Sequence, residues 1–211
     1  MDPITLARGT RACAELEIKR SRFLGFAQRI ASEGDARAFF EELRSTYPDA
    51  RHHCTAFSVR GEGNPIERSS DDGEPSGTAG MPMLQTLRGS GLVDVAVLVV
   101  RYFGGIKLGT GGLVRAYSDT VSATLDAATT VRLVTQPTWQ VEASAADAGR
   151  WHSLFEAHDI AVLDVTYGTR ALFTVSYRDA DAFDSLLASL TSGQASARPC
   201  PPTVREVPVR R

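Results

Sequence analysis

The glycine-rich segment at residues 101–112, RYFGGIKLGTGG, has the composition of an anion-binding loop. Glycine lets a backbone turn sharply and approach a ligand closely. A helix is expected to start at the end of this segment, where unpaired N–H groups carry partial positive charge. We therefore predict a nucleic-acid or other anion site made of Arg101, Gly104, Gly105, Lys107, Gly109, Gly111, Gly112 and Arg115. The alternative is a tight strand-to-helix connection whose glycines serve packing alone.

The segment does not match the common nucleotide-binding fingerprints. In a P-loop the second glycine precedes a lysine, whereas here Gly109 precedes Thr110. A dinucleotide-binding loop has a third glycine at the position where this chain has Val114. The sequence therefore predicts no nucleotide cofactor, and we expect no other cofactor.

A second polar loop, residues 69–80 (SSDDGEPSGTAG), carries three carboxylates at Asp71, Asp72 and Glu74. They lack the spacing of an EF-hand, and Asp-Asp-Gly favours turns by itself. The GEPSG stretch places its serine one position too late for a nucleophile elbow. We assign no metal ligand and no catalytic residue here, and metal binding by the three carboxylates stays open as an alternative.

His52, His53 and Cys54 have the residue types of a zinc site or a catalytic pair. On a strand, His52 and Cys54 share one face and His53 points to the other, so the three converge only at a bulge. Cys13 and Cys200 stand too far away in the sequence to supply a ligand pair. The pattern predicts a buried thiol beside partly buried histidines. Such a sparse set of cysteines is also typical of a reducing compartment.

Composition restricts the class of protein. The chain has 211 residues, 43% of them hydrophobic, and a net charge of −2, which excludes a strongly basic body that binds nucleic acid by charge alone. The small basic patch at Lys19, Arg20 and Arg22 is interpreted as a solvated edge. The longest apolar run, residues 95–100, is too short to cross a membrane. The N-terminus has no signal-peptide pattern, so we expect a cytoplasmic protein without a membrane partner.

The N-terminal elements follow from periodicity. Alternation predicts strands at residues 12–18, 23–30 and 54–60, and apolar residues at helical spacing predict a helix over residues 36–47, capped by Ser32. Residues 61–80 are expected to form one long loop. A short helix with Met83, Leu84 and Leu87 inward should follow. The run VDVAVLVV then predicts a strand covered on both faces, followed by a helix from about 111 to 128.

The C-terminal part of the chain predicts a separate domain. Four strands and two amphipathic helices are arranged there in the order βαββαβ, which is typical of a ferredoxin-like domain. Pro137 and the polar TQPT stretch indicate the boundary. We therefore expect an α+β protein with an N-terminal domain at residues 1–133 and a C-terminal domain at residues 134–211.

Several of these strings together resemble the IMPACT family, including its bacterial YigZ-type members. They are SRFLGF, ARHHCTAF, DDGEPSGTAGMPML and VLVVRYFGGIKLGTGGLVRAYSD. The resemblance covers roughly residues 20–128. It implies a left-handed βαβ domain shared with a small-subunit ribosomal protein and with domain IV of elongation factor G. The C-terminal unit would be similar to domain V of that factor.

The resemblance also implies a role in translation. Eukaryotic family members restrain a stress-activated kinase of translation initiation and carry an additional N-terminal RWD domain, for which we expect no room here. The implied function is a translation-associated regulatory protein that binds RNA or a ribosome-associated partner, with phosphates contacting Arg101, Lys107 and Arg115. Two alternatives remain. One is a phosphoester-type hydrolase that uses the carboxylates of residues 69–80, the acidic loop, with His52 or His53. The other is a pure protein-interaction module.

Overall fold

The computed structural model describes residues 2–209, which form two compact units. The first unit contains residues 2–132 together with 206–209, and the second contains residues 133–205. Each unit combines a β-sheet with α-helices, so the chain has a mixed α/β architecture in two parts.

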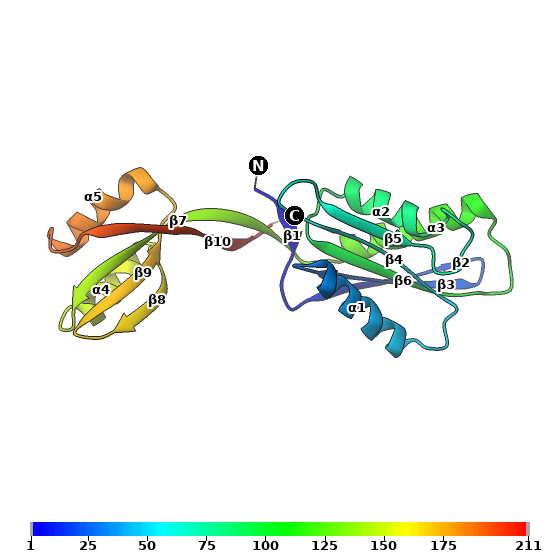
Figure 1. The fold of residues 1–211 in the computed structure, drawn as a ribbon, viewed down its shortest axis with the longest axis horizontal. Coiled ribbons are helices and arrows are strands. Elements are labelled where there is room, and N and C mark those ends of the chain that lie inside the picture. Colours follow the sequence, from blue (N-terminus) through cyan, green and yellow to red (C-terminus); the bar gives the residue numbers. More distant parts are fainter. Residues whose placement is uncertain (1, 210–211) are drawn as a thin grey trace. The chain divides into compact units, whose positions relative to one another are not determined.

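The first unit is built on an antiparallel five-stranded sheet in the order β2-β3-β6-β4-β5. Its elements are β2 (Arg11–Ile18), β3 (Ser21–Arg29), α1 (Glu33–Thr46), β4 (His52–Val59), β5 (Ile66–Ser70), α2 (Gly80–Gly89), β6 (Val95–Tyr102) and α3 (Thr110–Asp126). Helices α2 and α3 cover one face of this sheet and α1 covers the other (Figure 1). Helix α1 joins β3 to β4, which run parallel to each other because β6 lies antiparallel between them.

The central strand β6 supplies side chains to two hydrophobic cores. The two sets are Val95, Val97 and Val99 on the α2–α3 side and Ala96, Leu98 and Val100 on the α1 side. None of the six is more than 1% exposed. The predicted strand covered on both faces is therefore confirmed.

Helix α1 begins at the predicted cap. Ser32 Oγ accepts a hydrogen bond from the amide of Asp35 (3.1 Å), and Asp35 Oδ2 accepts one from the amide of Ala31 (2.8 Å). The first bond satisfies a backbone donor that the first turn of a helix leaves without a partner, and the second holds the residue before the cap.

The expectation of one uninterrupted loop over residues 61–80 is wrong. Strand β5 (Ile66–Ser70) lies inside it and pairs antiparallel with β4. Its residues are mostly exposed because β5 is the edge strand of the sheet. An edge strand with so little buried surface needs no apolar alternation, so periodicity gave no signal for it. The short strand β1 (Ile4–Leu6) was likewise not predicted.

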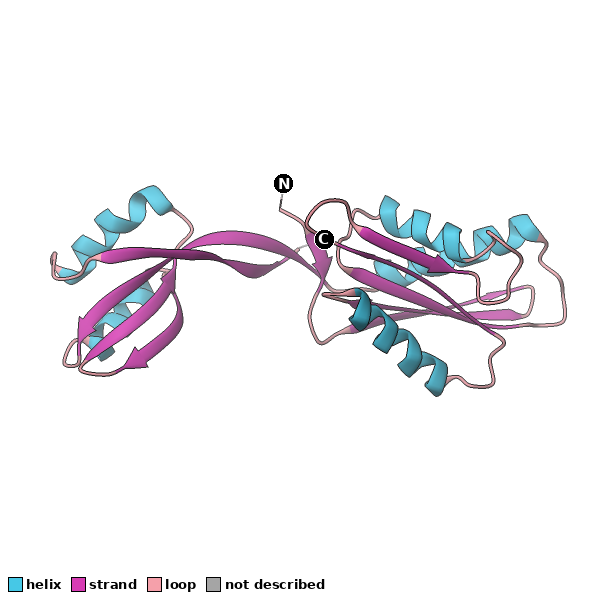
Figure 2. Ribbon diagram, viewed as in Figure 1, coloured by secondary structure: helices cyan, strands magenta, loops and turns pink. Residues whose placement is uncertain are grey.

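The second unit has the predicted order of elements, with two helices packed on one sheet (Figure 2). These elements are β7 (Thr130–Ser144), α4 (Ala148–Ala157), β8 (Ala161–Tyr167), β9 (Arg170–Ser176), α5 (Ala180–Thr191) and β10 (Ala197–Pro208). In the sheet, β9 lies between β7 and β8, and β10 pairs with β7. The core contains Trp139, Trp151, Phe155, Phe173 and Phe183.

The predicted boundary segment around Pro137 is part of strand β7. Residues 130–132 of this strand pair with β1, and residues 138–144 pair with β9. Pro137 falls between these two ladders. A polar, proline-containing segment can therefore be part of a strand.

Residues 206–209 also differ from the expected division, because they pack with the first unit. Glu206 Oε1 accepts hydrogen bonds from Arg8 Nε (2.9 Å) and Arg29 Nη1 (2.6 Å). The amide of Val209 donates to the carbonyl oxygen of Thr130 (3.2 Å). These contacts are between residues distant in sequence, so local patterning could not predict them.

Gly25→Ala should destabilise the first unit, because α3 packs directly on β3 at this position. A Cβ there would lie 2.1 Å from Thr124 Oγ1 and 2.9 Å from Thr120 Cγ2. We expect the free energy of unfolding, measured by denaturant titration, to fall by about 1–3 kcal/mol.

Gly34→Ala is the matched control. A Cβ at this position in α1 would have its nearest contact at 3.4 Å, and alanine has the higher helix propensity. Stability should stay constant or rise by up to about 1 kcal/mol. Equal losses in the two variants would contradict the close approach at Gly25.

Candidate functional site

The Gly-rich loop, residues 104–112, leaves the end of β6 and packs on the turn between β2 and β3. A Cβ at Gly104 would lie 2.0 Å from the carbonyl carbon and oxygen of Arg20, so no other residue fits there. The amide of Gly104 donates to Ser21 Oγ (3.2 Å). In the turn itself, Lys19 and Arg20 have left-handed φ angles of 48° and 64°. The tip of the β2–β3 hairpin and the Gly-rich loop therefore form one continuous surface.

The remaining glycines shape the entry into α3. Gly105 and Gly109 have φ angles of 87° and 75°, which favour glycine. Gly109 is the N-cap of α3 and supplies no side-chain hydrogen bond to the first turn. A Cβ at Gly111 would meet no atom within 4 Å, whereas one at Gly112 would lie 3.1 Å from Leu108 Cβ. The space in front of the helix start at Gly111 is therefore open.

Four exposed cations belong to this surface and to the start of α3: Lys19, Arg20, Lys107 and Arg115. Within residues 2–209, none of them has an ion-pair partner. Lys19 and Lys107 are the two lysines of the chain. The sequence interpretation of Lys19 and Arg20 as a solvated edge overlooked that they lie beside the Gly-rich loop.

A cavity elsewhere in the first unit is also lined by cations, but these are paired with carboxylates. Its volume is about 900 Å³, and four arginines line it: Arg8, Arg11, Arg29 and Arg60. Each of these guanidinium groups is already paired with a carboxylate, at distances of 2.6–2.9 Å. Unpaired positive charge that could bind an anion is therefore found at the Gly-rich loop rather than in this arginine-lined cavity.

Arg101 does not belong to the exposed anion site that the sequence predicted. It is only 6% exposed, and its Nη1 donates to Glu74 Oε1 at 2.6 Å. The guanidinium carbon lies 5.3 Å from the ring centroid of Phe23 and 5.7 Å from that of Phe103. The alternation of β6 turns Arg101 toward the same face as Val99, inside the unit. Its charge is compensated there, so Arg101 positions the loops and is removed from the set expected to contact phosphates.

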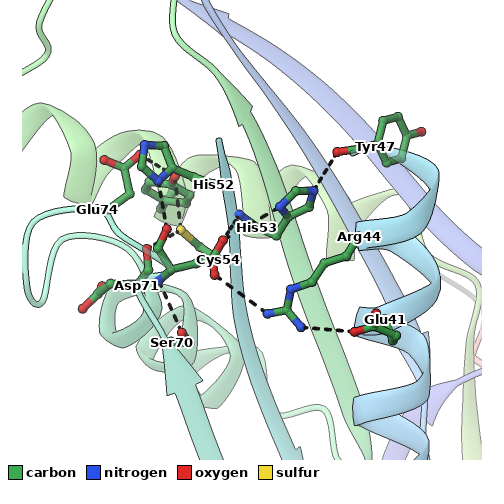
Figure 3. A network of polar contacts seen from close by, with 11 residues as sticks. Glu41, Arg44, Tyr47, His52, His53, Cys54, Ser70, Asp71 and Glu74 are labelled. Atoms are coloured by element: carbon green, nitrogen blue, oxygen red, sulfur yellow. Dashed lines mark hydrogen bonds and ion pairs between the residues drawn. The ribbon is translucent and has the colours of Figure 1, made fainter. Parts of the chain in front are cut away.

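Glu74 is the centre of a buried polar chain that also contains Cys54 (Figure 3). Glu74 Oε1 accepts a hydrogen bond from the Tyr117 hydroxyl (2.8 Å). The Cys54 thiol can donate to the hydroxyl oxygen of Tyr117 (3.3 Å) or to the carbonyl oxygen of Asp71 (3.0 Å). Burial raises the pKa of Cys54 to about 12, and burial is also the main cause of the raised pKa of Tyr117. The predicted buried thiol is therefore confirmed.

The carboxylate of Asp71 holds the acidic loop against the start of α2. Its Oδ1 accepts hydrogen bonds from the amides of Ala79 (3.0 Å) and Gly80 (2.8 Å), and its Oδ2 accepts one from Gly77 (2.8 Å). Burial raises the pKa of Asp71, but the three amide hydrogen bonds outweigh burial, so the pKa is lowered. Asp71 thus remains ionised and satisfies amides that would otherwise lack partners.

Asp72 holds the first residues of β4 in a similar way. Its Oδ2 accepts a hydrogen bond from the amide of His53 (2.6 Å), and its carbonyl oxygen lies 2.9 Å from His52 Nδ1. His53 Nε2 lies 2.9 Å from the carbonyl oxygen of Tyr47, on the α1 side (Figure 3). Cys54 lies in the core on the opposite side, so the predicted alternation of His53 and Cys54 is confirmed.

The three carboxylates of the acidic loop therefore hold backbone and side-chain donors in place. In the part of the chain that the structure describes, no three His, Cys, Asp or Glu side chains are grouped as a metal site would require. None of the described helices has the length and apolar character needed to cross a bilayer. What the arrangement offers chemically is a fixed loop with unpaired positive charge.

The comparisons with known proteins agree on one family. Residues 19–125 match the model of the Impact N-terminal domain. The IMPACT family member YvyE of Bacillus subtilis is 33% identical over 189 residues, covering 87% of this chain and 85% of that protein. The IMPACT family member YigZ of Escherichia coli is 50% identical over 118 residues, covering 55% and 57%. A crystal structure described as a hypothetical protein is 35% identical, covers 93% of this chain and 97% of its own, and has a TM-score of 0.59.

Glu74→Gln should strongly destabilise the first unit, because it leaves the buried guanidinium of Arg101 without a counter-charge. We expect a loss of about 3–5 kcal/mol in the free energy of unfolding. Combining it with Arg101→Met should recover part of that loss, since no buried charge then remains. Denaturant titration of both single variants and the double variant measures the coupling, and strictly additive losses would show that the two groups act independently.

Cys54 should resist alkylation in the folded protein. Burial raises its pKa to about 12, so almost no thiolate forms at pH 8. Treatment with iodoacetamide, followed by peptide mass spectrometry, should label the exposed Cys13 and spare Cys54. Unfolding in denaturant should make both react. Rapid native labelling of Cys54 would contradict the buried arrangement.

Proposed function

This chain belongs to the IMPACT family, and we propose that it is a regulatory protein of translation that binds RNA of the ribosome or of a ribosome-associated complex. The Gly-rich loop and the β2–β3 turn would contact the RNA phosphates. The observation that carries this proposal is the group of exposed, unpaired cations formed by Lys19, Arg20 and Lys107, with Arg115 on α3. The cytoplasm, where ribosomes work, is the corresponding location.

Local charge matters more here than net charge. The chain as a whole carries −2, but electrostatic attraction between exposed groups extends only about 8–10 Å at physiological salt. A phosphate at the Gly-rich loop would therefore respond to nearby unpaired cations rather than to distant carboxylates. The left-handed glycines and the open space at Gly111 allow close backbone approach, and the start of α3 adds partial positive charge.

The two units support an assignment to domain types found in translation factors. We infer that the first is the left-handed βαβ domain, for which the β3–α1–β4 crossover between parallel strands is the support. We infer that the second is a ferredoxin-like domain, for which the βαββαβ order and the position of β9 between β7 and β8 are the support. The resemblance to the IMPACT family associates both types with elongation factor G.

The contacts of the acidic loop favour binding over hydrolysis. Asp71 accepts three amide hydrogen bonds, Asp72 accepts one from His53, and Glu74 is paired with Arg101. A general acid or base must reach the proton that it transfers. Carboxylates engaged in this way favour a role in holding the loop over a role in hydrolysis.

Lys107→Ala should weaken RNA binding and reduce its salt dependence. Each phosphate contact to single-stranded RNA contributes a slope of about 0.7 in log affinity against log salt, so the slope should fall by about that amount. Fluorescence anisotropy of a labelled oligoadenylate, titrated at several salt concentrations, measures both quantities. Stability should change by less than about 0.5 kcal/mol, since Lys107 is exposed.

Arg37→Ala is the control for net charge, because Arg37 is an exposed cation already paired with Glu33 on α1. It should leave both affinity and slope nearly constant. Co-sedimentation with ribosomal subunits, before and after ribonuclease treatment, tests the cellular partner. Binding that survives ribonuclease, together with no affinity for the oligonucleotide, would reject the RNA proposal and favour a protein-interaction module.

A further inference from the structure

Phe103 is an exposed aromatic side chain directly before the Gly-rich loop. It is 52% exposed, and no other Phe, Tyr or Trp in the described part of the first unit is classed as exposed. It directly precedes Gly104, whose backbone lies against Arg20. The backbone that follows Phe103 therefore lies next to the hairpin tip that carries Lys19 and Arg20.

The position of the Phe103 ring is fixed from the interior. The guanidinium of Arg101 lies within 6 Å of two rings, 5.3 Å from the centroid of Phe23 and 5.7 Å from that of Phe103. Such contacts are attractive because the ring face is electron-rich. Arg101 is held in turn by its short ion pair with Glu74 (2.6 Å). The polar core thus holds one side of Phe103 while more than half of the residue stays in contact with solvent.

We propose that Phe103 is a stacking surface for an unpaired nucleobase, so that the RNA bound at the Gly-rich loop is single-stranded there. This inference rests on the proposed function. Proteins that bind single strands combine cations along the backbone with aromatic rings on which bases stack. Lys19, Arg20 and Lys107 would supply the first component and Phe103 the second. In a duplex the bases are already stacked on one another, so the ring would find no free base face.

The nature of the surroundings favours a base over an apolar protein segment. A docking site for an apolar segment is expected to be depleted of charge at its centre. Here the ring directly precedes a loop that carries unpaired charge at Lys107, and that loop packs on the turn that carries Lys19 and Arg20. A nucleotide offers a π face and a phosphate within one unit, which matches an aromatic ring next to free cations.

The experiment measures binding of labelled oligoadenylate to Phe103→Ala over a range of salt concentrations. Affinity should fall about 5- to 150-fold, the range expected for one stacked base, while the salt slope stays at the wild-type value because no charge is removed. An abasic oligonucleotide of equal length has the same phosphates without bases, so wild type and Phe103→Ala should bind it equally. Tyr167→Ala, which removes an exposed aromatic residue from the second unit, is the matched control and should bind oligoadenylate normally.

Two further variants separate stacking from loss of bulk or of folding. Phe103→Leu keeps an apolar side chain without a π face and should bind oligoadenylate as weakly as Phe103→Ala. Phe103→Trp should bind at least as tightly as wild type, and its added indole fluorescence should be quenched by oligoadenylate and not by the abasic strand. Far-ultraviolet circular dichroism and thermal unfolding confirm that each variant is folded.

The outcomes distinguish this inference from the proposed function. If Lys107→Ala lowers the salt slope while Phe103→Ala binds oligoadenylate like wild type, the stacking surface is rejected and the phosphate site stands. If Phe103→Ala weakens binding of the abasic strand as much as that of oligoadenylate, stacking is also rejected. If wild type binds neither strand, both proposals fail.

Discussion

The buried ion pair between Glu74 and Arg101 links the acidic loop to the central strand of the first unit. Arg101 stands near the end of the central strand, and Glu74 stands in a polar loop that precedes α2. Both side chains are at most 7% exposed, so each would carry a large desolvation cost without the other. The hydroxyl of Tyr117 on α3 donates to the same carboxylate oxygen. The carboxylate of Glu74 thereby connects the acidic loop to the sheet and to α3.

The Glu74–Arg101 ion pair also determines which cations remain exposed near the Gly-rich loop. Because Arg101 is neutralised inside, positive charge near the Gly-rich loop depends on exposed side chains such as Lys107 and Lys19. The same guanidinium lies against Phe103 and fixes the ring at the start of the loop. A polar network in the interior can therefore give a surface loop a defined shape without any contact to a ligand, which reduces the ordering that binding would require.

Local patterns in the sequence were sufficient for much of the fold. The cap at Ser32, the double burial of β6 and the opposite orientations of His53 and Cys54 each follow from the identity and spacing of neighbouring residues. The edge strand β5 and the path of β7 through Pro137 were missed. Both are strands defined by their partners rather than by their own apolar content, and a partner cannot be read from a periodicity.

The amino-acid pattern alone was enough to place a glycine-rich, cation-bearing loop between a buried strand and a helix, and to exclude a nucleotide fingerprint. Which of its cations are free became clear only from the folded chain. It turned Arg101 inward to Glu74, a residue 27 positions away, and placed Gly104 against Arg20, which is separated from it by more than eighty positions. The physical reason is that ion pairing and close backbone contact depend on strand order and on which face of a strand is buried, and both are properties of the assembled sheet.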